Sequence, residues 1–157
     1  MYIIKIKMGK SYNVVLNSEM STLTTVGETF NIDWGFLPNG PYKVSFCFNS
    51  AIATLTNGII AAIYVDIGQG RTTKIACNSS SNAVGYRNNY LGTLFYTGTG
   101  ASNNLYADTH TNVPIYIENR PTNNTVFVQI HTSSIDATTN YTPAPGAYIL
   151  TLNFEEC

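Results

Sequence analysis

The amino-acid sequence predicts an all-β protein, a two-sheet antiparallel β-sandwich with jelly-roll (Greek-key) topology. Three observations lead to this fold class. Val, Ile, Thr, Tyr and Phe dominate runs of five to ten residues, clusters of Gly, Asn, Pro and Ser separate the runs, and the clearest runs alternate between apolar and polar side chains. A chain of 157 residues is the size of one ordinary domain, so residues 1–157 are expected to form a single jelly-roll domain.

The predicted strands follow one another along the whole chain. They are Tyr2–Lys7, Tyr12–Leu16, Glu28–Asp33, Tyr42–Ser50, Ile59–Ile67, Thr72–Cys77, Tyr90–Tyr96, Asn104–Ala107, Val113–Glu118, Thr125–Thr132 and Ala147–Phe154. So many short strands joined by long loops indicate two packed sheets with Greek-key connections.

Three of these strands show which of their faces meets the core. One face is apolar and the other polar, which is typical of an antiparallel sheet packed on a single core. The predicted inward rows are Tyr42, Val44, Phe46 and Phe48, then Val126, Val128 and Ile130, then Tyr148, Leu150, Leu152 and Phe154. Cys47 lies inside the first of these strands, where we expect a buried thiol that behaves as a small hydrophobe.

Residues Ala51–Val65 also permit a helical interpretation, because apolar residues recur there at roughly helical spacing. Asn57-Gly58 interrupts that pattern with a hairpin signal, and a glycine inside a helix costs about 1 kcal/mol relative to alanine. The strand interpretation is therefore preferred, with a single helical turn before Asn57 left open.

The segments between strands carry further structural expectations. Trp34 is predicted to anchor the core and to find a partner for its N–H. Pro38 is assigned to the same structural set, in the loop that enters a strand, because proline fixes φ and has no N–H to donate. Arg120, Pro121 and Asn123 are predicted to form a turn in which asparagine side chains bond their own backbone.

The charge of the chain is unusually low. Charged residues make up 11% of the sequence and the net charge is −1, while 20 Thr, 18 Asn and 11 Ser supply the polarity. The sequence therefore lacks the excess of basic residues that a nucleic-acid-binding protein is expected to have. The sequence has no run long enough for a transmembrane helix and no recognisable signal peptide, so the protein is expected to remain inside the cell. Neutral polar surfaces favour permanent packing against neighbours, as in an assembly component.

Chemistry-bearing residues are sparse. Only His110 and His131 are available as bases, and pairings of Cys77 with His131 or of His110 with Asp108 have no recognisable local motif. The acidic residues lack the spacing of a metal site. The sequence therefore predicts no enzyme activity, no catalytic residue, no cofactor and no metal.

Three segments together carry a family resemblance. Residues 37–48 read Leu-Pro-x-x-x-Tyr-x-Val-x-Phe-x-Phe, Arg120–Asn124 read Arg-Pro-x-Asn-Asn, and Leu150–Glu155 read Leu-x-Leu-x-Phe-Glu. In this order the chain resembles the single-jelly-roll minor capsid proteins of large nucleocytoplasmic double-stranded DNA viruses. The resemblance implies a structural capsid component that holds larger capsomers together, as a homo- or hetero-oligomer with other capsid proteins. It also implies a protein made in the host cytoplasm and located in the virion.

A lectin-like carbohydrate- or receptor-binding module is the alternative, because jelly rolls serve both purposes. Tyr90, Tyr106 and Tyr141 are the candidate ligand-binding residues, with Tyr86 and Tyr96 nearby. A trimeric signalling-type jelly roll is a third class, weakened by the lack of a secretion signal. For the assembly role, we expect Tyr2–Lys7 and the long loop Ser133–Gly146 to contact partners.

Overall fold

Twelve strands and two short 3₁₀ helices make up the part of the chain that the structure describes. The computed structural model describes residues 9–23, 27–52, 61–67, 74–76, 86–88, 90–97, 103–107, 114–131 and 147–157. The elements are β1 (Ser11–Asn17), η1 (Ser18–Met20), β2 (Thr22–Leu23), β3 (Glu28–Asn31), η2 (Trp34–Phe36), β4 (Tyr42–Ile52), β5 (Ala61–Asp66), β6 (Lys74–Ala76), β7 (Tyr86–Asn88), β8 (Tyr90–Thr97), β9 (Asn103–Ala107), β10 (Ile115–Ile117), β11 (Thr125–His131) and β12 (Tyr148–Glu156).

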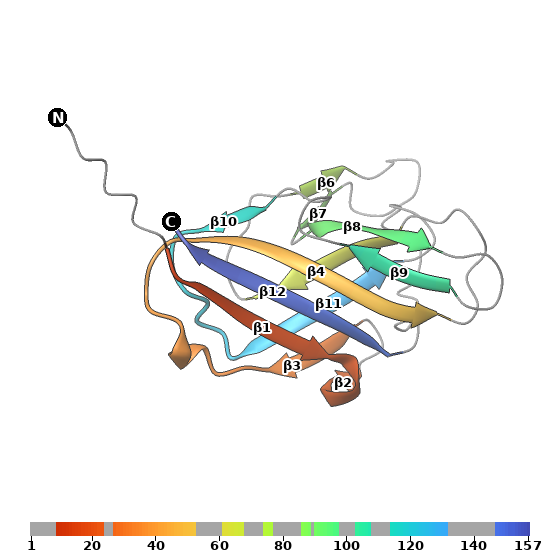
Figure 1. Cartoon of the computed structure of the whole chain (residues 1–157), viewed down its shortest axis with the longest axis horizontal. Coiled ribbons are helices and arrows are strands. Elements are labelled where there is room, and N and C mark those ends of the chain that lie inside the picture. The colour runs from red at the N-terminus through yellow and green to blue at the C-terminus, as the bar shows by residue number, and fades with distance from the viewer. Residues whose placement is uncertain are drawn as a thin grey trace.

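Ten of the twelve described strands form two antiparallel sheets packed as a sandwich, and β6 and β7 pair with each other. The first sheet has the order β1-β12-β4-β9, with β10 paired to part of β4, and the second has the order β8-β5-β11-β3-β2. Strand β8 pairs with β5 along one part and with β9 along another, so it connects the two sheets. Figure 1 shows β1, β12 and β4 side by side, crossing in front of β11. The predicted sandwich is confirmed, and the strand order is compatible with a jelly roll.

Alternation along the central strands builds the core. In the pairing of β12 with β4, Leu150 lies opposite Phe48, Leu152 opposite Phe46, and Phe154 opposite Val44. These side chains point between the sheets and meet the buried row of β11. The inward rows expected from the sequence are all buried, and they are Tyr42, Val44, Phe46, Phe48, Val126, Val128, Ile130, Tyr148, Leu150, Leu152 and Phe154.

Two loops close one end of the sandwich. Trp34 is buried, and its Nε1 donates to the carbonyl of Asn123 at 2.7 Å. Arg120 Nη1 donates to the carbonyl of Leu37 at 3.1 Å, and Asn123 Oδ1 accepts from the N–H of Thr125 at 3.2 Å. Segments almost ninety positions apart in the sequence are thus joined by hydrogen bonds, which gives Trp34, Arg120 and Asn123 a structural role.

Two residues differ from their expected environment. Cys47 is exposed, not buried, because it alternates with Phe46 and Phe48 and therefore faces outward. Pro38 is exposed and does not belong to the core, although its carbonyl accepts a hydrogen bond from the buried Tyr42 hydroxyl at 2.7 Å.

Most strand boundaries lie within a few residues of their predicted positions. Strand β3 ends at Asn31, before the predicted Asp33, because the Asp33 carboxylate accepts from the N–H of Gly35 and caps η2. The short strands β2 and β7 were not predicted. Residues 51–52 and 61–66 are strands, so the helical interpretation fails at both ends of its range. The predicted strand Tyr2–Lys7 and the loop Ser133–Gly146 lie outside the described residues.

We expect Leu150→Ala to lower the free energy of unfolding by about 2–5 kcal/mol, because Leu150 has no exposed surface and its loss leaves a cavity. The neighbouring Thr151→Ala, on the outward face of the same strand, should change stability by less than about 0.5 kcal/mol. Denaturant unfolding measures both. Equal effects of the two substitutions would contradict the described register.

Candidate functional site

The outward face of the first sheet is a continuous described surface made by three paired strands, β1, β12 and β4. Its rows follow from the pairings of β1 with β12 and of β12 with β4. We name it the outer sheet face, and its residues are Ser11, Asn13, Val15, Asn17, Lys43, Ser45, Cys47, Asn49, Ile149, Thr151, Asn153 and Glu155. Val15 and Ile149 are 62% and 50% exposed, and Asn153 Nδ2 donates to Asn13 Oδ1 at 2.8 Å.

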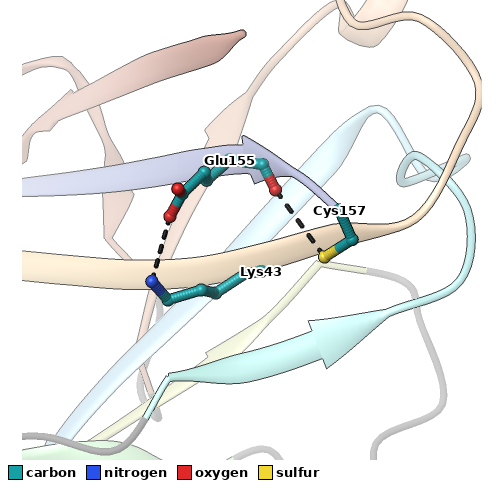
Figure 2. Close-up of polar contacts among 3 residues, drawn as sticks. All are labelled: Lys43, Glu155 and Cys157. Atoms are coloured by element: carbon teal, nitrogen blue, oxygen red, sulfur yellow. Dashed lines mark hydrogen bonds and ion pairs between the residues drawn. The ribbon is translucent and has the colours of Figure 1, made fainter. Parts of the chain in front are cut away.

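The only two charged residues of the outer sheet face pair with each other. Lys43 Nζ lies 3.0 Å from Glu155 Oε2 at one end of the face, as Figure 2 shows. The hydrogen bond that Lys43 donates to the Glu155 carboxylate raises the pKa of Lys43. Tyr116 of β10, opposite Lys43 and 70% exposed, continues the same end. The face therefore carries no unpaired charge.

Hydrogen bonds from the last residues of β12 hold β1 and the residue before it at this end of the sheet. The N–H of Glu156 donates to the carbonyl of Lys10 at 3.0 Å, and the Tyr12 hydroxyl donates to Glu156 Oε1 at 3.1 Å. Burial and the Glu156 carboxylate raise the pKa of Tyr12. The exposed Cys157 lies beside Glu155, with Sγ 4.0 Å from its carbonyl oxygen (Figure 2).

A groove of about 470 Å³ runs between β1 and the segment that follows β3. We name it the β1–β3 groove. The residues that line it are Asn13–Asn17, Met20, Phe30–Asp33 and Phe36. Met20 and Phe36 are exposed, and Asp33 is the only charged residue of the lining. The groove therefore has a mixed lining, in which Asn13, Asn17, Asn31 and Asp33 stand beside the apolar side chains, and the edge of β1 forms one wall.

One carboxyl group is buried between the two sheets. Glu28 is 5% exposed, and its Oε2 accepts a short hydrogen bond from the hydroxyl of Tyr148. Burial raises the pKa of Glu28, and hydrogen bonds from Tyr148 and Ser21 only partly offset that effect. Tyr148 in turn stacks on Phe48, with ring centroids 5.1 Å apart. The pair links β12 of the first sheet to β3 of the second.

The described residues do not assemble a metal centre. In that part of the chain no three His, Cys, Asp or Glu residues come close enough to hold a metal ion. His131 pairs with Ala62 at the end of β11, while Cys77, His110 and Asp108 lie outside the described residues. No helix within the described ranges is long and apolar enough to cross a membrane.

The candidate tyrosines are not brought together along the described backbone. Tyr90 pairs with Tyr64 in the second sheet, whereas Tyr106 pairs with Asn49 and Phe95 in the first. Phe95 is five residues from Tyr90 along β8, which is about 17 Å of strand. Tyr141 lies outside the described residues. These positions supply no observation in favour of a shared sugar site.

Sequence reasoning missed the β1–β3 groove and the pair of Glu28 with Tyr148. The groove lies between strands of different sheets, and Glu28 and Tyr148 are 120 positions apart, so no local pattern reveals either feature. One signal was available: Glu28 alternates in phase with Phe30, which places it on the inward face of β3. No protein-family model matches the chain, and a search of curated proteins finds no match.

We expect the stability of the protein to fall as pH rises through the raised pKa of Glu28. Its folded state binds the proton more tightly than its unfolded state, so the stabilising contribution is complete below the usual value of 4.5 and is lost above the raised value. Glu28→Gln, which stays neutral, should remove this part of the pH dependence. Tyr148→Phe should enlarge it, because it removes a donor that favours the carboxylate. Thermal melting at a series of pH values measures all three proteins, and an unchanged profile in Glu28→Gln would contradict the assignment.

Proposed function

We propose that the protein is a structural component of a viral capsid, a minor capsid protein that holds larger capsomers together and performs no catalysis. The observation that carries this proposal is the outer sheet face, which is broad, polar and without unpaired charge. The resemblance of residues 37–48, 120–124 and 150–155 to such proteins supports it. In this role the protein is made in the host cytoplasm and resides in the virion, next to other capsid proteins.

The strand order also supports the proposal. With β1-β12-β4-β9 in one sheet and β3-β11-β5-β8 in the other, four pairs of strands alternate between the sheets in the manner of two Greek keys. A jelly roll of this kind presents two broad sheet faces and two sets of loops. A fold alone does not define a function, so the proposed capsid role depends on the properties of the outer sheet face.

The free energy needed to cover the outer sheet face depends on whether its side chains are charged or neutral. A charged side chain must be paired to be buried at low cost, whereas Asn, Ser and Thr need only a hydrogen bond. The described outer sheet face contains just one ion pair, and both of its members can remain paired when they are covered. A stable contact buries about 1,200–2,000 Å² in total. A sheet face whose only two charges are paired with each other can be covered without a complementary charge on the partner.

We expect gradient-purified particles of the virus that encodes the chain to contain it in a fixed ratio to the major capsid protein. Thr151→Lys and Ile149→Lys each place an unpaired charge on the outer sheet face, and each should reduce incorporation on the order of tenfold or more. Thr122→Lys places the same charge in an exposed turn and is the matched control. Quantitative mass spectrometry of the particles provides the readout, with thermal melting to check folding.

Two results would overturn the proposal. One is a protein that is abundant in infected cells but missing from purified particles. The other is wild-type incorporation of both outer-face variants, which would leave the outer sheet face without a role.

A further inference from the structure

One edge of β1 has no partner strand among the described residues. Within the described part of the chain, β1 pairs with β12 on one side only and ends the strand order of the first sheet. Because the carbonyl of Lys10 accepts from Glu156 of β12, the backbone groups of Tyr12, Val14 and Leu16 point toward β12, and those of Ser11, Asn13 and Val15 point away from it. A row of hydrogen-bonding groups therefore faces the open edge.

The β1–β3 groove lies along this same edge. Met20 and Phe36 leave apolar surface exposed on its walls, and Val14 and Leu16, whose side chains are buried in the core, also line it. An open strand edge beside a groove with apolar side chains on its walls is an arrangement that can accept an added β-strand: backbone hydrogen bonds give affinity and alternate side chains enter the groove. The occupant must then be an extended segment with apolar residues at every second position.

Residues 2–7 of this chain have that pattern. Tyr2, Ile4 and Ile6 alternate with Ile3, Lys5 and Lys7, so one side of an extended segment is apolar and the other carries both lysines. Six extended residues span about 20 Å, close to the length of the seven-residue β1. Placed antiparallel to β1, Ile6, Ile4 and Tyr2 lie opposite Tyr12, Val14 and Leu16 and share their inward direction.

The position of Gly9 limits how far residues 2–7 of the same copy can reach along β1. Lys10 continues the ladder with Glu156, and a side chain added at Gly9 would lie 2.4 Å from the Glu156 carbonyl oxygen. The φ angle of Gly9 is not left-handed, so Gly9 is not itself a central residue of a type I′ turn. Even the shortest hairpin, with a two-residue turn at Lys7 and Met8, would bring Tyr2 back only as far as Asn13, so residues 2–7 of the same copy would not run along the groove residues Asn13–Asn17.

We propose that Tyr2–Lys7 of a second copy of this chain adds as an antiparallel strand to the open edge of β1 and fills the β1–β3 groove with Tyr2, Ile4 and Ile6. The register that matches the apolar faces is self-complementary. It sets Gly9 of one copy opposite Gly9 of the other, so the two copies exchange segments around a two-fold axis and each groove is completed by its partner. The exchange pairs residues 2–16 of both copies as one antiparallel ribbon.

This proposal stands apart from the capsid role, and the two can fail separately. A protein that enters particles but does not form the exchanged dimer would retain the proposed function and lose this inference. A dimer that is missing from particles would do the reverse.

Two substitutions on adjacent residues test the apolar face. Ile4→Asp places a carboxylate in the groove and should raise the dimer dissociation constant on the order of tenfold or more. Ile3→Asp, on the opposite side of the segment, is the matched control and should leave the dimer intact. Sedimentation velocity of the full chain over a wide concentration range measures both, with melting curves to verify folding. A monomeric wild-type protein, or equal effects of the two substitutions, would overturn the proposal.

A cysteine cross-link tests the register and the origin of the strand. In a background with Cys47, Cys77 and Cys157 changed to serine, Ile3→Cys together with Val15→Cys places two thiols opposite each other across the exchanged pair. Oxidation should yield a disulfide-linked dimer on a non-reducing gel. Ile4→Cys with Val15→Cys, on opposite faces, is the control and should not cross-link. A disulfide within one chain, or no disulfide in the first pair, would contradict exchange between copies.

Discussion

The antiparallel pairing of β12 with β4 is the constraint on which the rest of the sandwich depends. Nine residues of β12 pair with β4 without a register shift, and β1 and β9 attach to the outer sides of this pair. Because side chains alternate strictly, a slip by one residue would turn Phe154 and its inward neighbours to solvent. The same slip would separate Lys43 from Glu155. One register therefore fixes both the core and the outer sheet face.

Sequence reasoning succeeded where this alternation is long. Strands β4, β11 and β12 each contain three or more inward residues in phase, so pattern alone placed Phe46, Val128 and Leu152 in the core. Strands β2 and β7 have two and three residues, too few to establish a period. Cys47 was assigned wrongly because the general tendency of cysteine to be buried was given more weight than its position between Phe46 and Phe48.

Contacts between distant segments were beyond the reach of local patterns. Glu28 and Tyr148 are 120 positions apart, and the walls of the β1–β3 groove come from strands in different sheets. Trp34 and Asn123 form a partial exception, since the sequence indicated a buried indole and a turn separately but not the hydrogen bond between them. These contacts are determined by the topology of the sheets, which depends on the register of every intervening strand. Small errors in each predicted register therefore accumulate.

A low-charge sandwich must still avoid uncontrolled association, and the open edge of β1 is one place where the described strands allow it. Lysines commonly protect such edges, and Lys5 and Lys7 are available for it, but both fall on the polar side of their segment. In the proposed exchange this side faces solvent, and the exposed backbone of each β1 is paired within a closed dimer. The outer sheet face then remains as the described surface suited to different partners. In the proposed register Lys5 and Lys7 lie opposite Asn13 and Ser11, so these lysines flank the outer sheet face at the β1 edge. A self-paired edge would thus limit self-association, while the part of the face built by β12 and β4 would still be free to bind larger neighbours.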